Sequence, residues 1–338
     1  MTSLEKKYQS LLEPSTLLKS DMQKLEGDIM ILGVGGKMGP SLAILAKKTL
    51  DSLGLKNKVI GVARFSEAGL ENELKAQGIE AIQADLLNDE ALYSLPQVKN
   101  ILYLAGTKFG TSGNESFTWA MNAYLPGRVA TKFKGSRIVV FSTGNVYPFT
   151  SVESGGATET TLPAPIGEYA QSCLGRERMF QYFSNLNHTP ILIYRLNYAN
   201  DVSYGVLLEI AKAVRESKPI DLAMGYVNVI WQNDANEIAL RSLWHCQVPA
   251  KILNVTGNQT LSVRKLAIEF GKRLDKVPVF KNDELPTALL SNASESERLF
   301  GISNTSLEQM MDIILEWLVK GGKTINKPTH FSERTGNF

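Results

Sequence analysis

The chain has 338 residues, of which 43% are hydrophobic and 21% charged, and its formal net charge at pH 7 is +2. This composition is typical of a globular protein with one large or two modest domains, and the small net charge gives no reason to expect a nucleic acid or an anionic membrane as partner. The two cysteines, Cys173 and Cys246, and three scattered histidines predict neither a disulfide framework nor a metal site.

The longest apolar runs and the first residues bear on where the protein is located. No apolar run approaches the roughly 20 residues that a membrane-spanning helix needs, and the first residues lack the apolar core of a signal peptide. We therefore expect a cytoplasmic protein. Residues 1–27 precede the first expected strand, and their apolar residues recur at helical spacing on either side of Glu13-Pro14-Ser15. We expect two short helices there, on the outside of a domain, with a frayed extension as the alternative.

The stretch Asp28–Gly39 carries the strongest local signal. Four apolar residues, Ile29–Leu32, run directly into a G-x-G-G-x-x-G sequence, and apolar residues at helical spacing follow it. A buried strand, a glycine turn and a helix in this order hold a dinucleotide pyrophosphate, because the glycines let the backbone approach and the helix N-terminus offers free N–H groups. An ordinary turn before a helix is the alternative. The expected cofactor contacts here are Gly33, Gly35, Gly36, Lys37, Met38 and Gly39.

Strands and helices alternate after the glycine turn. Strands are expected at 58–63, 79–84, 100–104, 136–142 and 190–195, and helices at 67–77, 115–134 and 167–185. This alternation predicts an α/β protein with a doubly wound parallel sheet and right-handed crossovers. We expect a Rossmann-type NAD(P)-binding domain over 28–196. Residues 197–338 are expected to form a smaller, mainly substrate-binding α/β part, with some segments returning to the first domain.

The residue at the end of the second strand bears on the form of the cofactor. An NAD site has an acidic residue there, which bonds the ribose 2′-hydroxyl, whereas this chain has Ala63-Arg64. A guanidinium at this position suits a 2′-phosphate, and Lys37 in the glycine turn is expected to add a second positive charge nearby. We therefore expect NADP or NAD, with NADP slightly favoured. The alternative is that Arg64 is a solvated loop residue and NAD binds without its usual acidic partner.

Two further strand ends are expected to face the cofactor. Asp85-Leu86 follows the third strand, where a carboxylate can accept a hydrogen bond from the adenine amino group. A helix cap before Asn88 is an equally good interpretation of Asp85. Leu104-Ala105-Gly106 ends the fourth strand with small residues, which let the cofactor pass close to the backbone. Asn122, in the following helix, completes the expected cofactor contacts.

Taken in order, these segments resemble a known family. The chain resembles the extended short-chain dehydrogenase/reductases, the group that includes NAD(P)-dependent sugar-nucleotide epimerases and dehydratases, over roughly residues 28–320. The matching segments are Gly33–Gly39, Asp85-Leu86, Leu104–Gly106, Phe141–Tyr147, Tyr169 at the start of a helix, and Ile252–Gly257 before a helix near Ser262.

The resemblance implies a set of catalytic residues. In that family a Ser or Thr at the end of the fifth strand and a Tyr-x-x-x-Lys motif on the next helix do the chemistry. The tyrosine is the general acid/base, the hydroxyl bonds the same substrate oxygen, and the lysine binds the nicotinamide ribose and lowers the pKa of the tyrosine. Here Thr143, or its neighbour Ser142, matches the hydroxyl position and Tyr169 matches the tyrosine. A packing tyrosine at a helix start is the alternative for Tyr169.

The lysine position of the motif holds Cys173, while Glu177 keeps the glutamate often seen four residues further on. A thiol supplies no positive charge, and an unperturbed tyrosine has a pKa of about 10. Another cation must then lower the pKa of Tyr169, and the candidates are Arg176, which returns to the same helix face two turns on, and the nicotinamide itself. We interpret Cys173 as a small buried residue, with a reactive thiol as the alternative.

The resemblance also bears on the reaction and on assembly. The dehydratase branch has an acidic pair where this chain has Gly144-Asn145, so a sugar dehydratase is disfavoured. The family's paired helices correspond to 115–134 and 167–185, which implies a homodimer through their apolar side chains. These side chains are Phe117, Met121, Tyr124, Met179, Phe180 and Phe183. The expected substrate contacts are Asn145, Asn197, Tyr198, Asn228 and Trp231.

Trp231 and Asp234 lie in the second part of the chain. Trp231 is better explained as a core residue than as a substrate contact, and Asp234 is expected to cap a helix over 235–245. Together these patterns predict an NAD(P)-dependent oxidoreductase or epimerase that acts on a hydroxyl- or carbonyl-bearing carbon of a sugar, sugar nucleotide or sugar-derived acid. The alternative is a non-catalytic or weakly catalytic NAD(P)-binding protein with a degenerate Tyr-x-x-x-Lys motif.

Overall fold

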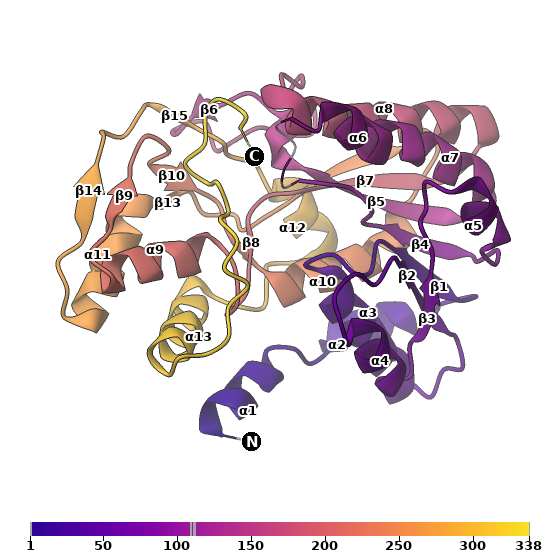
Figure 1. Ribbon diagram of the computed structural model, residues 1–338, viewed down its shortest axis with the longest axis horizontal. Coiled ribbons are helices and arrows are strands. Elements are labelled where there is room, and N and C mark those ends of the chain that lie inside the picture. Colours follow the sequence, from indigo (N-terminus) through magenta and orange to yellow (C-terminus); the bar gives the residue numbers. More distant parts are fainter. Residues whose placement is uncertain (1, 109, 111–112, 338) are drawn as a thin grey trace.

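A computed structural model describes residues 2–108, 110 and 113–337. Within this part of the chain, seven strands form one parallel sheet in the order β12-β7-β5-β4-β1-β2-β3 (Figure 1). They are β1 (Ile29–Leu32), β2 (Val59–Ala63), β3 (Glu80–Gln83), β4 (Asn100–Tyr103), β5 (Arg137–Thr143), β7 (Ile191–Leu196) and β12 (Lys251–Val255). The predicted doubly wound parallel sheet is confirmed.

Helices cover both faces of the sheet. Along β1, Ile29 and Ile31 face one helix layer while Met30 and Leu32 face the other, and all four are fully buried. This explains the unbroken apolar run, because a strand covered on both sides has no polar face. The first layer holds α2 (Thr16–Met22), α3 (Gly39–Ser52), α4 (Leu70–Ala76) and α10 (Gln232–Arg241), and the second holds α5 (Asp89–Ser94), α6 (Glu115–Trp119), α7 (Leu125–Lys132) and α8 (Gly167–Asn187).

The order of the strands reverses beside β1. This strand pairs with β2 on one side and with β4 on the other, so the loops after β1 and β4 leave the sheet next to each other at its carboxyl edge. Ligands of open α/β sheets bind in the crevice at such a reversal. The glycine turn after β1 and the Leu104-Ala105-Gly106 segment after β4 therefore line the place where a cofactor is expected.

The rest of the chain forms a smaller second part beside the sheet (Figure 1). Its core is built by Trp231 with apolar side chains of the helices α9 (Val206–Arg215), α11 (Val263–Leu274) and α13 (Leu307–Val319). Short paired strands surround this core, namely β8 (Ala199–Asn200) with β11 (Ile230–Trp231), β10 (Tyr226–Val227) with β13 (Leu261–Ser262), β9 (Pro219–Asp221) with β14 (Val279–Lys281), and β6 (Thr150–Ser151) with β15 (Thr287–Ala288). Helix α12 (Ser294–Phe300) packs on β12, which belongs to the main sheet.

The two ends of the chain connect the two parts. Helix α1 (Ser3–Ser10) packs on α13, with the Tyr8 ring 5.5 Å from the Trp317 ring, whereas α2 packs on α3 and α10. After α13, residues 324–337 form a C-terminal tail that runs between the two parts and ends near β6 and β15 (yellow in Figure 1). None of the helices in the described ranges is long and apolar enough to span a membrane.

Three predicted helices differ in the structure. Helix α4 begins at Leu70 and not at 67, because Gly69 adopts a left-handed conformation, φ 88°, just before it. The helix predicted over 115–134 contains a π-helical turn, Ala120–Tyr124, between α6 and α7. Helix α10 begins at Gln232, so Asp234 lies inside its first turn and does not cap it. The Asp234 carboxylate instead accepts hydrogen bonds from the backbone and hydroxyl of Thr305.

Candidate functional site

The glycine turn is packed tightly between β1, α3 and the end of β4. Gly33 has φ 89°, and a Cβ atom there would lie 2.6 Å from the Ala105 nitrogen. A Cβ on Gly39 would lie 2.2 Å from the Val34 carbonyl oxygen, which explains why α3 begins with a glycine. No side chain caps the first N–H groups of α3. Free N–H groups at a helix N-terminus beside exposed Gly35 and Gly36 fit a pyrophosphate, so the residues present suit a dinucleotide.

Lys37 does not stand beside Arg64 as a second cation for a 2′-phosphate. Its Nζ donates to the Ala199 carbonyl oxygen at 3.1 Å and lies 3.8 Å from the centre of the Tyr204 ring, so it joins the glycine turn to the second part. Part of the side chain is exposed, but the ammonium is enclosed, and this burial lowers its pKa to about 7 against the opposing effect of Asp201. The expected Lys37 contribution to NADP binding stays a prediction.

Arg64 and Asp85 are exposed at the ends of neighbouring strands, β2 and β3. The Arg64 carbonyl accepts a hydrogen bond from the Gln83 side chain, and the exposed guanidinium leaves the loop open to a ligand. Asp85 accepts from the backbone N–H of Leu87 at 3.0 Å, and Asn88 is the residue that caps α5. The helix-cap alternative for Asp85 is therefore wrong, while its contact with the adenine stays a prediction. Leu86 is buried.

Asn122 and Gly106 have structural roles that the sequence did not indicate. The Asn122 side chain is fully buried, and both its oxygen and its nitrogen form hydrogen bonds within the protein. The oxygen accepts from the Thr107 N–H and Arg176 Nη2, and the nitrogen donates to the Thr107 carbonyl and Ser172 Oγ. It therefore fixes the loop after β4, and the expected direct contact with the cofactor is wrong. A Cβ on Gly106 would lie 2.2 Å from Arg176 Nη2, so this glycine makes room for a guanidinium as well.

The hydroxyl groups of Thr143 and Tyr169 meet at the carboxyl edge of the sheet. Tyr169, in the first turn of α8, lies where the side chains of Thr143, at the end of β5, and Cys173, one turn further along the helix, both influence its pKa. Burial raises the pKa of Tyr169 well above its ordinary value, with Cys173 adding to the increase and Arg176 opposing it. Burial also raises the pKa of the Cys173 thiol, which is 1% exposed and packs among Val146, Tyr147 and Ala157.

Ser142, the neighbouring hydroxyl candidate, points to the opposite side of β5. Its Oγ donates to Glu177 Oε1 at 2.6 Å, and Glu177 forms a buried ion pair with Arg195, also at 2.6 Å. Successive side chains of a strand point to opposite faces, so only one of the two hydroxyls can reach Tyr169. Thr143 is that residue, and Ser142 helps to hold α8 against the sheet.

Only some of the predicted substrate contacts border the site. The Asn145 backbone N–H donates to Thr143 Oγ1 at 3.2 Å, and Asn197 lies against Gly144, where a Cβ would be 3.1 Å from Asn197 Oδ1. Tyr198, with φ 42°, donates through its hydroxyl to the Phe331 carbonyl oxygen of the C-terminal tail. Asn145 and Asn197 therefore lie beside the end of β5, and Tyr198 contacts the tail.

Asn228 and Trp231 do not face the site, so both predictions of substrate contact are wrong. Asn228 is buried, with its amide donating to the Gln259 carbonyl and accepting from the Ser291 N–H. Trp231 is fully buried in the core of the second part, 6.4 Å from the Tyr8 ring, as the core interpretation required. Trp231 belongs to β11, and Asn228 lies in the connection between β10 and β11.

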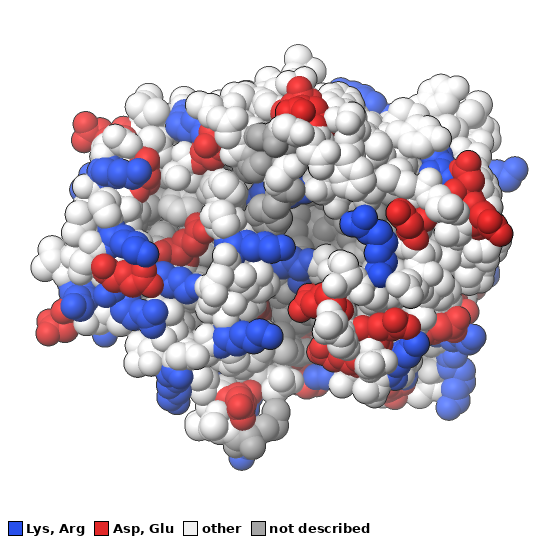
Figure 2. Space-filling model, in the orientation of Figure 1, with Lys and Arg blue, Asp and Glu red and all other residues white. Residues whose placement is uncertain are grey.

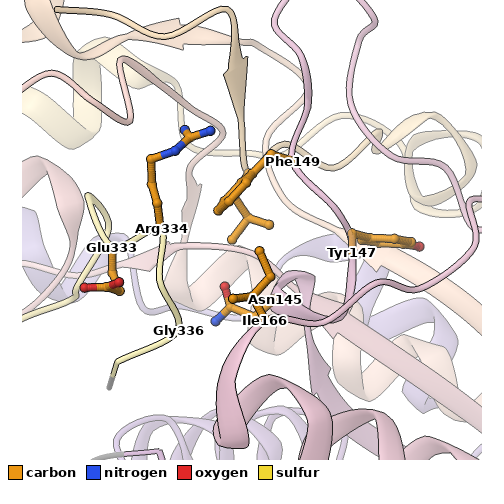
Figure 3. A pocket seen from close by; sticks show the side chains of 8 residues that line it. Asn145, Tyr147, Phe149, Ile166, Glu333, Arg334 and Gly336 are labelled. Atoms are coloured by element: carbon orange, nitrogen blue, oxygen red, sulfur yellow. The ribbon is translucent and has the colours of Figure 1, made fainter.

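The C-terminal tail lines a small pocket beside Asn145 (Figure 3). Asn145 and Ile166 lie on one side, and Glu333 and Arg334 of the tail lie on the other. The enclosed space of about 20 Å³ holds about one water molecule. Arg334 fastens the tail, because its guanidinium donates to the Thr287 carbonyl and hydroxyl.

Lys108 and the tail are parts of the site that sequence reasoning missed. Lys108 lies two residues beyond Leu104-Ala105-Gly106, and its Nζ donates to the Thr329 carbonyl oxygen of the tail at 3.3 Å. Its place just after a strand at the ligand-binding edge was the signal that could have found it. The contacts of the tail carry no sequence signal, because they join segments far apart in the chain.

The described residues show neither a strongly charged field on the face in Figure 2 nor a cluster of metal-binding side chains. Lys and Arg side chains are interspersed with Asp and Glu on the face in Figure 2, without a field of one sign. Among the described residues, no three His, Cys, Asp or Glu side chains lie together as a metal ion would need. The chemistry of the site therefore rests on hydroxyls, amides and the nearby cations.

Comparison with known proteins identifies the fold. No protein-family model matches the chain, and no curated protein sequence matches it significantly. Among solved structures, UDP-glucose 4-epimerase from Thermotoga maritima with UDP-glucose is 16% identical, with a TM-score of 0.71 and coverage of 87% of this chain and 99% of that chain. UDP-glucuronic acid 4-epimerase from Bacillus cereus with NAD is 17% identical, with a TM-score of 0.69 and coverage of 88% and 100%.

The chain has the same fold as these UDP-sugar 4-epimerase structures. The Bordetella bronchiseptica enzyme WbmG, in complex with NAD and UDP, gives the same result at 15% identity, with a TM-score of 0.71 and coverage of 89% of this chain and 97% of that chain. These matches span both the sheet and most of the second part. They confirm the fold that the glycine turn, the strand order and the resemblance predicted.

Proposed function

We propose that the chain binds NAD or NADP and transfers a hydride at a hydroxyl- or carbonyl-bearing carbon of a sugar nucleotide, as a 4-epimerase or a simple dehydrogenase. The observation that carries this proposal is that Thr143, at the end of β5, and Tyr169, in the first turn of α8, interact at the ligand-binding edge of the sheet. Structures of the same fold are UDP-sugar 4-epimerases, and several contain NAD. In this proposal residues 28–196 hold the cofactor and residues 197–338 mainly hold the sugar nucleotide.

The two hydroxyls have complementary tasks. Thr143 Oγ1 and the Tyr169 hydroxyl bind one substrate oxygen, and Tyr169 takes the proton of that oxygen on oxidation and returns it on reduction. A nicotinamide bound at the glycine turn would supply the hydride acceptor and donor for the same carbon. Oxidation followed by reduction from the other face inverts the carbon without net oxidation, whereas oxidation alone gives a dehydrogenase.

Arg176 is one source of positive charge near this tyrosine. Its buried guanidinium donates to the Phe141 carbonyl at 2.7 Å and to Asn122 Oδ1 at 2.8 Å, and it forms no ion pair within the described part of the chain. It opposes the rise that burial causes in the pKa of Tyr169. Because a guanidinium stays charged at every relevant pH, this effect does not depend on pH.

The proposed reaction is tested by incubating the protein with NAD and UDP-glucose, then with NAD and UDP-glucuronic acid. Proton NMR of the sugar should show the 4-epimer, or the absorbance of reduced nicotinamide should rise in proportion to an oxidised sugar. Tyr169→Phe protein is the matched control. Binding of NAD without either product, over a range of sugar nucleotides, would favour the non-catalytic alternative.

The choice between NAD and NADP rests on Arg64. We propose that its exposed guanidinium binds a 2′-phosphate, a charge-assisted contact worth about 1.5–3 kcal/mol, or roughly ten- to a hundred-fold in affinity. Calorimetric titration should then show tighter binding of NADP than of NAD, and Arg64→Ala should remove the difference. Lys58→Ala, at the other end of β2, is the control. Equal or tighter NAD binding by the unmutated protein would contradict the preference.

We further propose a homodimer through the helices α6, α7 and α8. Phe180, expected in this interface, is fully buried inside the monomer, 5.1 Å from the Tyr103 ring, so it takes no part. The outer face instead presents Tyr124, Tyr182 and Leu186, which are 61%, 59% and 57% exposed. Three large apolar side chains at this exposure on packed helices suit a second copy of the same face.

Light scattering at micromolar concentration should therefore give twice the monomer mass, and Tyr182→Glu should halve it. Tyr93→Glu, an equally exposed tyrosine on α5, should leave the dimer intact, because it lies on a different helix. A monomer mass for the unmutated protein would overturn this proposal.

A further inference from the structure

Lys108 brings an ammonium group to the face of Tyr169. The residue lies on the loop after β4, at the same edge of the sheet as the start of α8, and its Nζ is 6.0 Å from the centre of the Tyr169 ring. This distance is the outer limit for attraction between a cation and an aromatic ring. Lys108 also interacts electrostatically with Cys173, one helical turn from Tyr169.

The C-terminal tail holds this ammonium in place. Lys108 Nζ donates to the Thr329 carbonyl oxygen, and the Thr329 N–H donates to Glu209 Oε1 at 2.6 Å. The Thr329 hydroxyl also donates to the Glu209 carboxylate. Thr329 is 3% exposed. A lysine on a loop is therefore fixed by a buried residue of the tail, which is itself fixed by helix α9.

We propose that Lys108 supplies, from a different segment of the chain, the ammonium that the residue at position 173 does not supply, and that it favours the ionised form of Tyr169. The inference rests on the proposed function for its use in catalysis, but the interaction itself exists without substrate. Lys108 acts through Tyr169 and is a positioning residue. It complements Arg176, a residue of α8 whose guanidinium donates hydrogen bonds to the Phe141 carbonyl and to Asn122 Oδ1.

The charged and titratable groups around Lys108 determine the pH range in which its ammonium can stabilise the Tyr169 phenolate. Tyr169 and Cys173 face it from α8, Glu209 from α9 and Lys37 from the glycine turn. Burial lowers the pKa of the Lys108 ammonium to about 8, and the charges of Cys173 and Glu209 oppose this change. The ammonium is therefore present below about pH 8 and is lost above it, and its support of the Tyr169 phenolate follows the same course.

The effect is measured most directly with a more acidic tyrosine at position 169. Trifluorotyrosine can be incorporated there, and its ionisation followed by fluorine NMR in a pH range where Lys108 is still charged. With the ammonium 6.0 Å from the centre of the Tyr169 ring and an effective dielectric constant of about 20, it should lower the ionisation midpoint by about one to two pH units. We therefore expect Lys108→Met to raise the midpoint by that amount.

Two further variants separate charge from structure. Lys108→Arg keeps the positive charge and should restore most of the shift. Lys212→Met removes a lysine that also contacts the tail, through Thr324 and Asn326, but lies on α9 away from Tyr169, and it should leave the midpoint unchanged. The same midpoint with Lys108 and with methionine at position 108 would overturn the inference, as would an equal shift in the Lys212 variant.

This titration needs neither cofactor nor sugar nucleotide. A protein that shows the midpoint shift but no binding of NAD would contradict the proposed function and leave the Lys108 interaction standing. A protein that binds NAD and converts a UDP-sugar but shows no shift would contradict the Lys108 inference alone.

Discussion

Replacement of Tyr169 by phenylalanine is expected to lower the turnover of a sugar nucleotide by about 10²–10⁴-fold, the usual contribution of a general acid/base. The change removes only the hydroxyl, whose pKa Thr143 and Cys173 influence. Binding of NAD should change little, because the glycine turn is untouched. Since burial raises the pKa of this phenol, oxidation by the unmutated protein should also become faster as pH rises, as more phenolate forms. Steady-state rates and a cofactor titration measure these effects.

Two control variants make this result specific. Tyr93→Phe removes the hydroxyl of a tyrosine that is 49% exposed on α5 and should leave turnover unchanged. Cys173→Ala should have a much smaller effect than Tyr169→Phe, because the buried thiol mainly fills space among Val146, Tyr147 and Ala157. Full activity of Tyr169→Phe would show that another group is the base, and Cys173 would be the first residue to test.

Replacement of Glu177 by alanine is expected to have the largest effect on stability. The carboxylate is fully buried, accepts from Ser142 Oγ, and pairs with Arg195, whose side chain is 1% exposed. Removing it leaves a buried guanidinium without its partner, which typically costs about 3–5 kcal/mol. Urea unfolding should show this loss in the free energy of unfolding.

An exposed ion pair provides the contrast. Arg298 pairs with Glu295 at 2.7 Å, but its side chain is 66% exposed. Arg298→Ala should therefore cost less than about 1 kcal/mol. A loss below about 1 kcal/mol for Glu177→Ala as well would show that the buried pair does not hold α8 to β5 and β7 as the structure indicates.

The layered core was predictable because its sequence signals are local. The apolar run Ile29–Leu32 and the glycines after it encode a doubly buried strand and its turn without reference to distant residues. Helix boundaries were harder to predict where contacts with residues distant in the chain determine where a helix begins. Asp234 has the chemistry of a helix cap, but Thr305, 71 residues away in the chain, bonds its carboxylate, and α10 begins earlier. Nothing near Asp234 in the sequence reports that partner.

The site was predictable where the chemistry follows from a motif and unpredictable where it depends on side-chain direction. Thr143 and Tyr169 were named from a motif, and their catalytic roles stay predictions, while Ser142 could be separated from Thr143 only once the structure showed that it bonds Glu177. Asn228 and Trp231 are buried, which their local sequence does not report. Lys108 was missed because its partners, Tyr169 and Thr329, come from remote segments.

We propose that the Thr143–Tyr169 pair transfers a proton while hydride moves between a sugar nucleotide and a nicotinamide. The most direct measurement is a single-turnover experiment, in which protein loaded with NAD is mixed with UDP-glucose or UDP-glucuronic acid while the absorbance of reduced nicotinamide is followed. We expect a transient or lasting rise in the absorbance of reduced nicotinamide with the unmutated protein, and a rise that is at least about a hundred-fold slower with Tyr169→Phe. A rise at the same rate in both proteins would contradict this proposal.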